Sequence, residues 1–127
     1  MGREIKFRGL RLDGKGLAYG SLIQTIDGYC YIFSGDADDI HTCFMNLVNP
    51  ESIEQFIGVT DKNVIKVFEG DILENPKGDK GLVVFHEAVF YLKSTRRNGS
   101  VIYIQLNEGF ISNKKIIGNL HENPDLL

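Results

Sequence analysis

Cysteine and histidine, the side chains that most often bind zinc, come close together at one place in this sequence. His41 and Cys43 are two residues apart, so they would share one face of a strand, and Cys30 could lie on a neighbouring strand. A structural zinc site usually has four ligands, commonly with paired Cys-x-x-Cys spacing, and the sequence lacks that spacing. We therefore expect no zinc and no other cofactor, and ordinary buried residues instead.

An acidic run, Asp36-Ala37-Asp38-Asp39, contains the carboxylates that calcium prefers. An EF-hand loop that began at Asp36 would need Gly at its sixth place and Glu at its twelfth. Those two places hold His41 and Leu47. The pattern therefore predicts a solvated acidic loop.

His86 and Glu87 could act as a base and its partner. Adjacent residues of a strand point to opposite faces, so these two would face each other only if the chain turned there. The sequence has no nucleophile elbow, phosphate-binding loop or evident pair of catalytic carboxylates. We expect His86 and Glu87 to be exposed at the tip of a hairpin, in a protein that is not an enzyme.

Lys93, Arg96 and Arg97, with Tyr91 nearby, form a cluster of basic and aromatic residues. Small β-barrels bind nucleic acid through patches of this kind, and a solvated hairpin loop is the alternative interpretation. The net charge of −3 and the pI of about 5.6 argue against broad, non-specific binding to phosphate backbones, which requires a positive field. The cluster is a candidate nucleic-acid site on a chain whose total charge favours a protein partner.

The composition is that of a globular protein, with 43% hydrophobic and 24% charged residues in 127 positions. No apolar run approaches the ~20 residues of a membrane span. The first residues hold no secretory apolar region. We expect a cytoplasmic protein with reduced cysteines and no membrane partner.

The elements that must position these residues are mostly strands, because apolar residues recur with a period of two. Two strand-like runs flank Asp27-Gly28, a pair that accepts the positive φ of a tight hairpin turn. A second hairpin is expected to turn at His86–Ala88. Gly70-Asp71 is expected to open a strand, with Gly supplying an unusual dihedral angle and Asp accepting backbone N–H groups.

One helix of about two turns is predicted near residues 50–57. Asn49 can cap it and Pro50 suits its first position. Ile53, Phe56 and Ile57 would share one face of this helix.

Four stretches of the sequence, taken in order, carry a family resemblance. They are Arg3–Gly9, Tyr19–Leu22, the segment Pro50–Gly58 followed by Thr60–Asn63 and Phe68–Leu73, and Ile117–Leu127. In these stretches the chain resembles the YopX family of small phage and prophage proteins. The family usually has Asn-Gly in the central turn, whereas Val64 follows Asn63 here, which leaves the type of that turn open.

The resemblance implies a phage or prophage origin and a mainly β structure, and it carries over no catalytic residues. By analogy with SH3-like barrels, where a Gly-Asp pair often opens a strand, we expect an SH3-like β-barrel region over residues 60–127. A β-rich N-terminal region over residues 1–59, which includes the short helix, would precede the barrel.

Together these observations favour a non-enzymatic accessory protein that binds a host or phage protein. The alternative is a small β-barrel protein that binds nucleic acid through Lys93, Arg96 and Arg97. The tail ends in Leu126-Leu127, and several strands are apolar on both faces. Because a small monomer has little means of covering so much apolar surface, we also expect a homo-oligomer with a packed tail.

Overall fold

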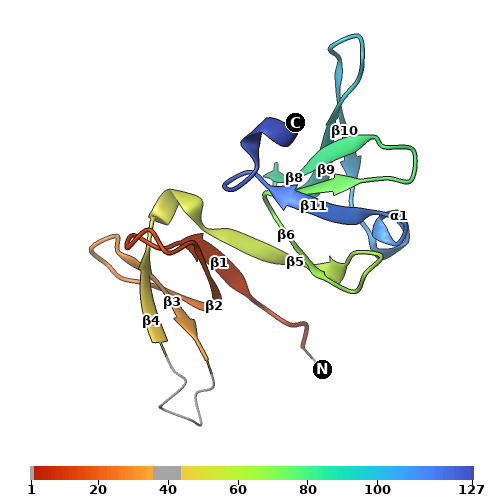
Figure 1. Cartoon of the computed structure of the whole chain (residues 1–127). Coiled ribbons are helices and arrows are strands. Elements are labelled where there is room, and N and C mark those ends of the chain that lie inside the picture. The colour runs from red at the N-terminus through yellow and green to blue at the C-terminus, as the bar shows by residue number, and fades with distance from the viewer. Residues whose placement is uncertain (1, 36–43) are drawn as a thin grey trace. The chain divides into compact units, whose positions relative to one another are not determined.

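The computed structural model describes residues 2–35 and 44–127. The protein is mainly β, as predicted, and Figure 1 shows its elements. The strands are β1 (Phe7–Leu10), β2 (Leu17–Gln24), β3 (Cys30–Ser34), β4 (Phe44–Val48), β5 (Glu54–Thr60), β6 (Lys66–Phe68), β7 (Asp71–Glu74), β8 (Lys80–His86), β9 (Val89–Thr95), β10 (Val101–Gln105) and β11 (Lys115–Asn119). The helical elements are the 3-10 turns η2 (Pro50–Ser52) and η3 (Pro124–Leu126) and the short helix α1 (Glu108–Ile111).

The chain forms two compact units, Met1–Phe56 and Ile57–Leu127, which we call the first and second units. β5 begins in the first unit and ends in the second. The division into regions 1–59 and 60–127 stays a prediction about domains. In the described parts of both units, no helix is long and apolar enough to cross a membrane.

The first unit is built from antiparallel pairs, β4 with β3, β3 with β2, β2 with β1, and β1 with the start of β5. The predicted hairpin at Asp27-Gly28 is confirmed, since β2 pairs with β3 and Gly28 has φ 91°. Ala18, Cys30, Ile32 and Val48 form the buried core of this unit. Cys30 is a free cysteine buried in this core.

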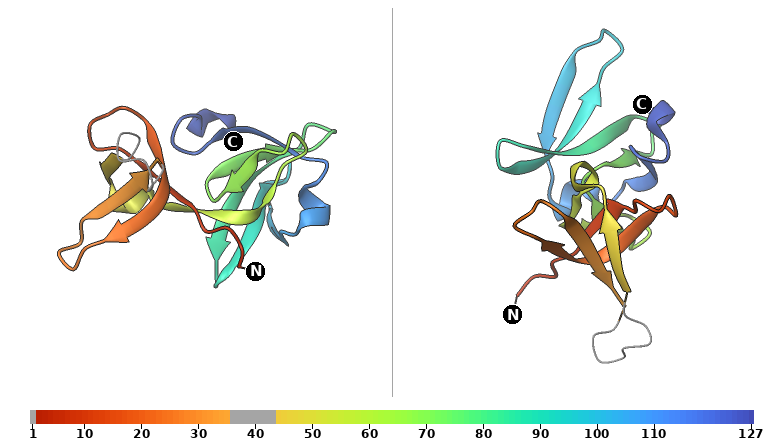
Figure 2. Two further views of the ribbon diagram at one scale, coloured as in Figure 1. Left: turned by 90° about the horizontal axis from the view of Figure 1, so that it is seen from below. Right: turned by 90° about the vertical axis from the view of Figure 1, so that its left-hand side faces the viewer.

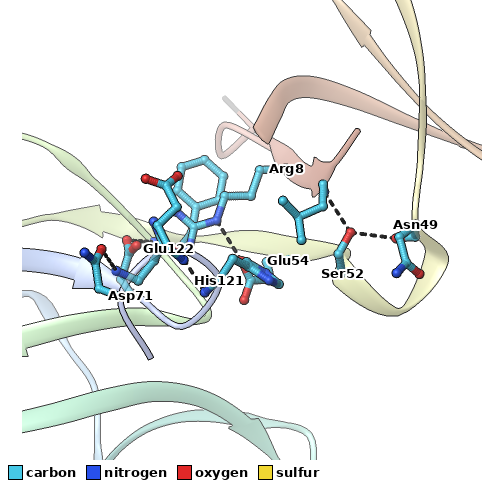
Figure 3. Close-up of polar contacts among 11 residues, drawn as sticks. Arg8, Asn49, Ser52, Glu54, Asp71, His121 and Glu122 are labelled. Carbon is cyan, nitrogen blue, oxygen red and sulfur yellow. Dashed lines mark hydrogen bonds and ion pairs between the residues drawn. The ribbon is translucent and has the colours of Figure 1, made fainter. Parts of the chain in front are cut away.

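The helix predicted near residues 50–57 is wrong except for its first turn. Asn49 caps η2 by accepting the Glu51 N–H, and from Glu54 onward the chain is strand β5. A helix this short is marginal without tertiary contacts. Here the competing contacts are stronger, because Glu54 pairs with Arg8 across β1 and β5, with 2.8 Å between Arg8 Nε and Glu54 Oε1 (Figure 3).

The second unit contains a five-stranded antiparallel sheet in the order β10-β9-β8-β7-β11. Val67, Leu73, Val83, Leu92 and Ile111 form its buried core. Among the described residues β10 and β11 are the two ends of this sheet and do not pair with each other, so the closed SH3-like barrel is not confirmed. After β10 the chain leaves the sheet and forms α1, whose N-cap Asn107 accepts the Phe110 N–H at 2.9 Å.

Two aspartates fix turns of the second unit. Asp71 accepts the Phe68 N–H at 2.8 Å while Gly70 has φ 84°, which confirms the expected roles of the Gly-Asp pair. Asp61 accepts the N–H groups of Asn63, Ile65 and Ile116. Both carboxylates are therefore hydrogen-bond acceptors for backbone N–H groups.

The zinc and calcium candidates lie mostly outside the described residues. His41, Cys43 and the acidic run at residues 36–39 are not described, so nothing follows about metal binding there. In residues 2–35 and 44–127, no group of three or more His, Cys, Asp or Glu side chains is arranged to hold a metal ion.

Candidate functional site

The candidate site is built on the three strands β8, β9 and β10 of the second unit. Leu92 pairs with Val83 on one side and Ile104 on the other, so these apolar residues share the face that we call the inner face. Lys93 pairs with Leu82 and Tyr103, and these residues share the opposite, outer face. The alternation of a strand therefore sends Leu92 and Lys93 to different faces of one sheet.

The turn between β9 and β10 positions two arginines. The Arg96 N–H donates to the Ser100 carbonyl at 2.8 Å, and Asn98 Oδ1 accepts both the Ser100 N–H and its hydroxyl. Gly99 provides the positive φ of 85° that the turn requires. Arg96 and Arg97 are exposed at the tip of this hairpin, which projects from its sheet (Figures 1 and 2).

A groove of about 410 Å³ lies on the inner face. Its floor is apolar and includes Leu73, Leu92, Ile102, Ile104 and Phe110. Four basic residues line it, namely Lys80, Arg96, Arg97 and Lys114, against a single acidic residue, Asp79. We call this the main groove. An apolar floor surrounded by cations suits an anionic ligand that also carries apolar groups.

Lys114 is the most unusual of these cations because it is only 8% exposed. Its ammonium donates to the Phe110 carbonyl at 2.7 Å and to Asn113 Oδ1 at 3.1 Å, and it lies 3.6 Å from the centroid of the Phe110 ring. Burial lowers the pKa of Lys114, because desolvation disfavours the charged form. Both of these hydrogen-bond acceptors are neutral, so within the described part of the chain the ammonium has no carboxylate as a direct partner.

Two further hollows adjoin the main groove. The one on the outer face, about 360 Å³, shares Asp79, Lys80 and Thr95 with the main groove and adds Lys93. The other, about 470 Å³, shares Asn75 and adds Lys62, Lys77 and Lys115. We call the basic residues of all three hollows the basic band.

The basic band holds eight of the nine Lys and Arg residues of the second unit, and the ninth is Lys66. Two acidic residues, Glu74 and Asp79, line the same hollows. Glu74 Oε1 lies 3.7 Å from Lys115 Nζ, so the Glu74 carboxylate forms an ion pair with one of the basic residues. The second unit thus places eight of its nine basic residues in three adjoining hollows on both faces of its sheet, although its nine acidic residues make its formal charge zero.

Three aromatic rings lie together on the outer face beside Lys93. The His86 ring stacks on Tyr103 with 5.0 Å between centroids and an interplanar angle of 16°. Tyr91 is edge-on to both, at 6.3 Å from His86 and 6.1 Å from Tyr103. Tyr103 is 45% exposed. The outer face therefore offers ring surface next to a cation.

The turn at His86–Ala88 is the predicted hairpin tip, with positive φ at Glu87 and Ala88. His86 and Glu87 are exposed there, as expected, and 3.9 Å separates His86 Nε2 from Glu87 Oε1. The tip presents this pair to solvent, outside the three hollows of the basic band.

The predicted cluster of Lys93, Arg96 and Arg97 is divided by the structure. Arg96 and Arg97 line the main groove, whereas Lys93 lines the hollow of the outer face. Sequence reasoning did not identify Lys80 and Lys114 as their neighbours. The spacing of 34 positions between these two lysines gives no local signal, and only the sheet brings them together. The nucleic-acid role of the predicted cluster stays a prediction.

Comparison with known proteins gives a family and a similar fold. The model of the family described as YopX protein matches residues 6–127. Among solved structures, the chain is similar to the crystal structure of protein EF1440 from Enterococcus faecalis, with 22% sequence identity, a TM-score of 0.51 and 99% of each chain covered. No curated protein matches this sequence. At this identity the similarity to EF1440 shows the fold alone.

Proposed function

We propose, from the premise that the chain belongs to the YopX family, that this protein is a phage or prophage accessory protein that binds a macromolecular partner in the host cytoplasm and catalyses no reaction. The partner is a host or phage macromolecule with a negatively charged surface. The binding surface is the basic band of the second unit.

The observation that carries this proposal is the concentration of cations around an apolar floor in the main groove. Lys80, Arg96 and Arg97 are exposed there, and Lys114 is buried and donates to neutral acceptors. Neighbouring like charges repel one another and lower the stability of the free protein, and an anionic partner would relieve this repulsion.

A second candidate function, nucleic-acid binding, is favoured by a separate observation. The aromatic rings of Tyr91 and Tyr103 lie on the outer face with Lys93, which lines the hollow of that face. Exposed rings beside cations are the usual components of a surface that binds unpaired bases. The acidic charge of the whole chain does not oppose this function, because the second unit alone is formally neutral.

Cross-linking in cells that carry the gene tests the proposal. A tagged wild-type chain is compared with the charge-reversed variant Arg96→Glu/Arg97→Glu, in which both changes lie in an exposed turn. We expect a defined macromolecule to be cross-linked to the wild type and to be absent with the variant. Equal recovery with both chains would show that the basic band is not the binding surface.

A further inference from the structure

We propose that the basic band is a track for a single-stranded nucleic acid that passes from one face of the sheet to the other past Lys80 and Thr95, which line both hollows. Its phosphates would lie along the cations of the three hollows, with unpaired bases in the main groove on the inner face and one base stacked on Tyr103 on the outer face. This inference rests on the proposed function and specifies the partner of the same surface.

The distribution of charge points to an extended polyanion. Each of the three adjoining hollows contains at least two basic residues. The main groove shares lining residues with each of the other two hollows, so the three are continuous. A single compact anion would need one of these hollows only. A nucleic-acid strand carries one charge per nucleotide, so it can contact cations in all three.

The acidic residues of the unit leave this surface positive. Asp61 and Asp71 accept backbone N–H groups inside the fold, and Glu74 lies beside Lys115. Asp79 takes part in its own loop, where its Oδ2 accepts from Asn75 Nδ2 at 3.1 Å. A local positive field attracts phosphates even where the net charge of the domain is zero.

The aromatic rings distinguish a nucleic acid from an acidic peptide. Tyr103 is 45% exposed and pairs directly with Lys93 on the outer face, and His86 stacks on one side of its ring. A base stacked on the other side of the ring would bring its phosphate within reach of a cation. A peptide of Asp and Glu would gain nothing from this ring. Bases of a duplex are already stacked on each other, so only unpaired bases can use the ring.

Lys114 supplies the deepest contact of the track. Its buried ammonium has two neutral acceptors and lines the main groove together with Arg96 and Arg97. A phosphate placed there would neutralise a charge that burial makes unfavourable in the free protein. The same phosphate would receive hydrogen bonds from guanidinium groups, which match its geometry well.

Fluorescence anisotropy with a labelled oligothymidylate of about 15 nucleotides tests the inference, since single-strand sites extend over roughly 4–16 nucleotides. An oligouridylate of the same length, a duplex and polyglutamate are the comparison probes, so the DNA and RNA arms separate the two sources of a single strand. We expect binding to at least one single strand, weaker binding to the duplex, and a logarithm of the binding constant that falls linearly with the logarithm of salt concentration.

Two variants separate charge from stacking. Arg96→Ala/Arg97→Ala should reduce the salt slope by roughly one for each phosphate that the variant no longer binds. Tyr103→Ala should weaken binding by about 5-fold to 150-fold at an unchanged salt slope, because it removes a stacking ring and no charge. Lys15→Ala and Tyr29→Ala, at exposed positions of the first unit, are the matched controls and should bind as the wild type does.

Absence of binding to both single strands at low salt would overturn the inference. Equal binding of polyglutamate would also overturn it in favour of an acidic protein, and would leave the proposed function standing. A loss with Lys15→Ala as large as that with the arginine variant would show non-specific attraction and would contradict the track.

Discussion

Each unit of this protein contains a buried cation, and the two cations have partners of different charge. Arg8 in the first unit is 2% exposed and has the Glu54 carboxylate at 2.8 Å. Lys114 in the second unit is 8% exposed, and its ammonium donates to neutral oxygens at the wall of a groove. The first charge is balanced inside the fold, whereas an anion of the proposed partner would balance the second. On this account Arg8 has a structural role and Lys114 a role in binding.

The largest effect is expected from removing the carboxylate in the first unit. Glu54→Leu leaves the Arg8 guanidinium buried without its 2.8 Å ion-pair partner. Removing one member of a buried pair costs roughly 3–5 kcal/mol in the free energy of unfolding, because the remaining charge stays desolvated and loses the opposite charge of the pair. Urea denaturation measures this loss. A loss below about 1 kcal/mol would mean that the pair does not hold β1 to β5.

A smaller effect is expected at the floor of the main groove. A Cβ added at Gly81 would lie 2.6 Å from Leu92 Cγ and 2.8 Å from its Cδ1. Gly81→Ala must therefore displace a core side chain, at a cost of about 1–3 kcal/mol in the free energy of unfolding. The same displacement should weaken oligonucleotide binding. An unchanged denaturation midpoint would show that Leu92 and β9 move without cost.

Removing the charge of Lys114 should change the free energy of unfolding less than Glu54→Leu or Gly81→Ala does. Lys114→Met loses two hydrogen bonds to neutral acceptors but also removes the desolvation of a charge, so we expect a change within about 1 kcal/mol at neutral pH. Oligonucleotide affinity should fall nonetheless. A loss as large as that of Glu54→Leu would contradict the distinction between the two cations.

The pH dependence sharpens this prediction. Burial lowers the folded-state pKa of Lys114 below the ordinary value of 10.5, so between these two pKa values the unfolded chain binds more protons than the folded one. The wild type should therefore gain stability relative to Lys114→Met as the pH rises toward 10.5. Denaturation of both chains from neutral pH upward measures this difference, and a constant difference would refute it.

The smallest effect is expected from the tail. Leu126 is half-buried and lines the outer hollow with Leu127, which is 58% exposed. Deleting Asp125–Leu127 should lower the melting temperature by a few degrees, or lower the oligomeric mass if the exposed leucine packs on a second copy. Light scattering and thermal denaturation test both. A monomer at high micromolar concentration with an unchanged melting temperature would contradict the predicted homo-oligomer.

Local sequence signals predicted the strands and hairpins well because those signals act over a few residues. The turns at Asp27-Gly28 and His86–Ala88 were identified from flanking period-two patterns. The turn in which Val64 replaces the usual Gly after Asn63 is not a type I′ turn. Val64 alone in its turn takes a positive φ, 62°, whereas a type I′ turn requires positive φ at both central residues.

Contacts between distant residues were not predictable in this way. The helix expected near residues 50–57 failed because Glu54 pairs with Arg8 on another strand. The main groove was missed for the same reason, since Lys80 and Lys114 meet Arg96 only through the sheet. The cap Asn107 with Glu108 was a local signal for α1, but four residues of helix gave too little periodicity to recognise.

One measurement tests the central claim that the second unit, and not the first, carries the binding surface. Two-dimensional 1H–15N NMR of the whole chain would be recorded during titration with the oligothymidylate. We expect the amide signals of Arg96, Arg97, Tyr103 and Lys114 to shift together in a saturable manner, while those around Arg8 and Glu54 stay in place. Shifts concentrated in residues 2–35, or no saturable shifts at the basic band, would contradict the account.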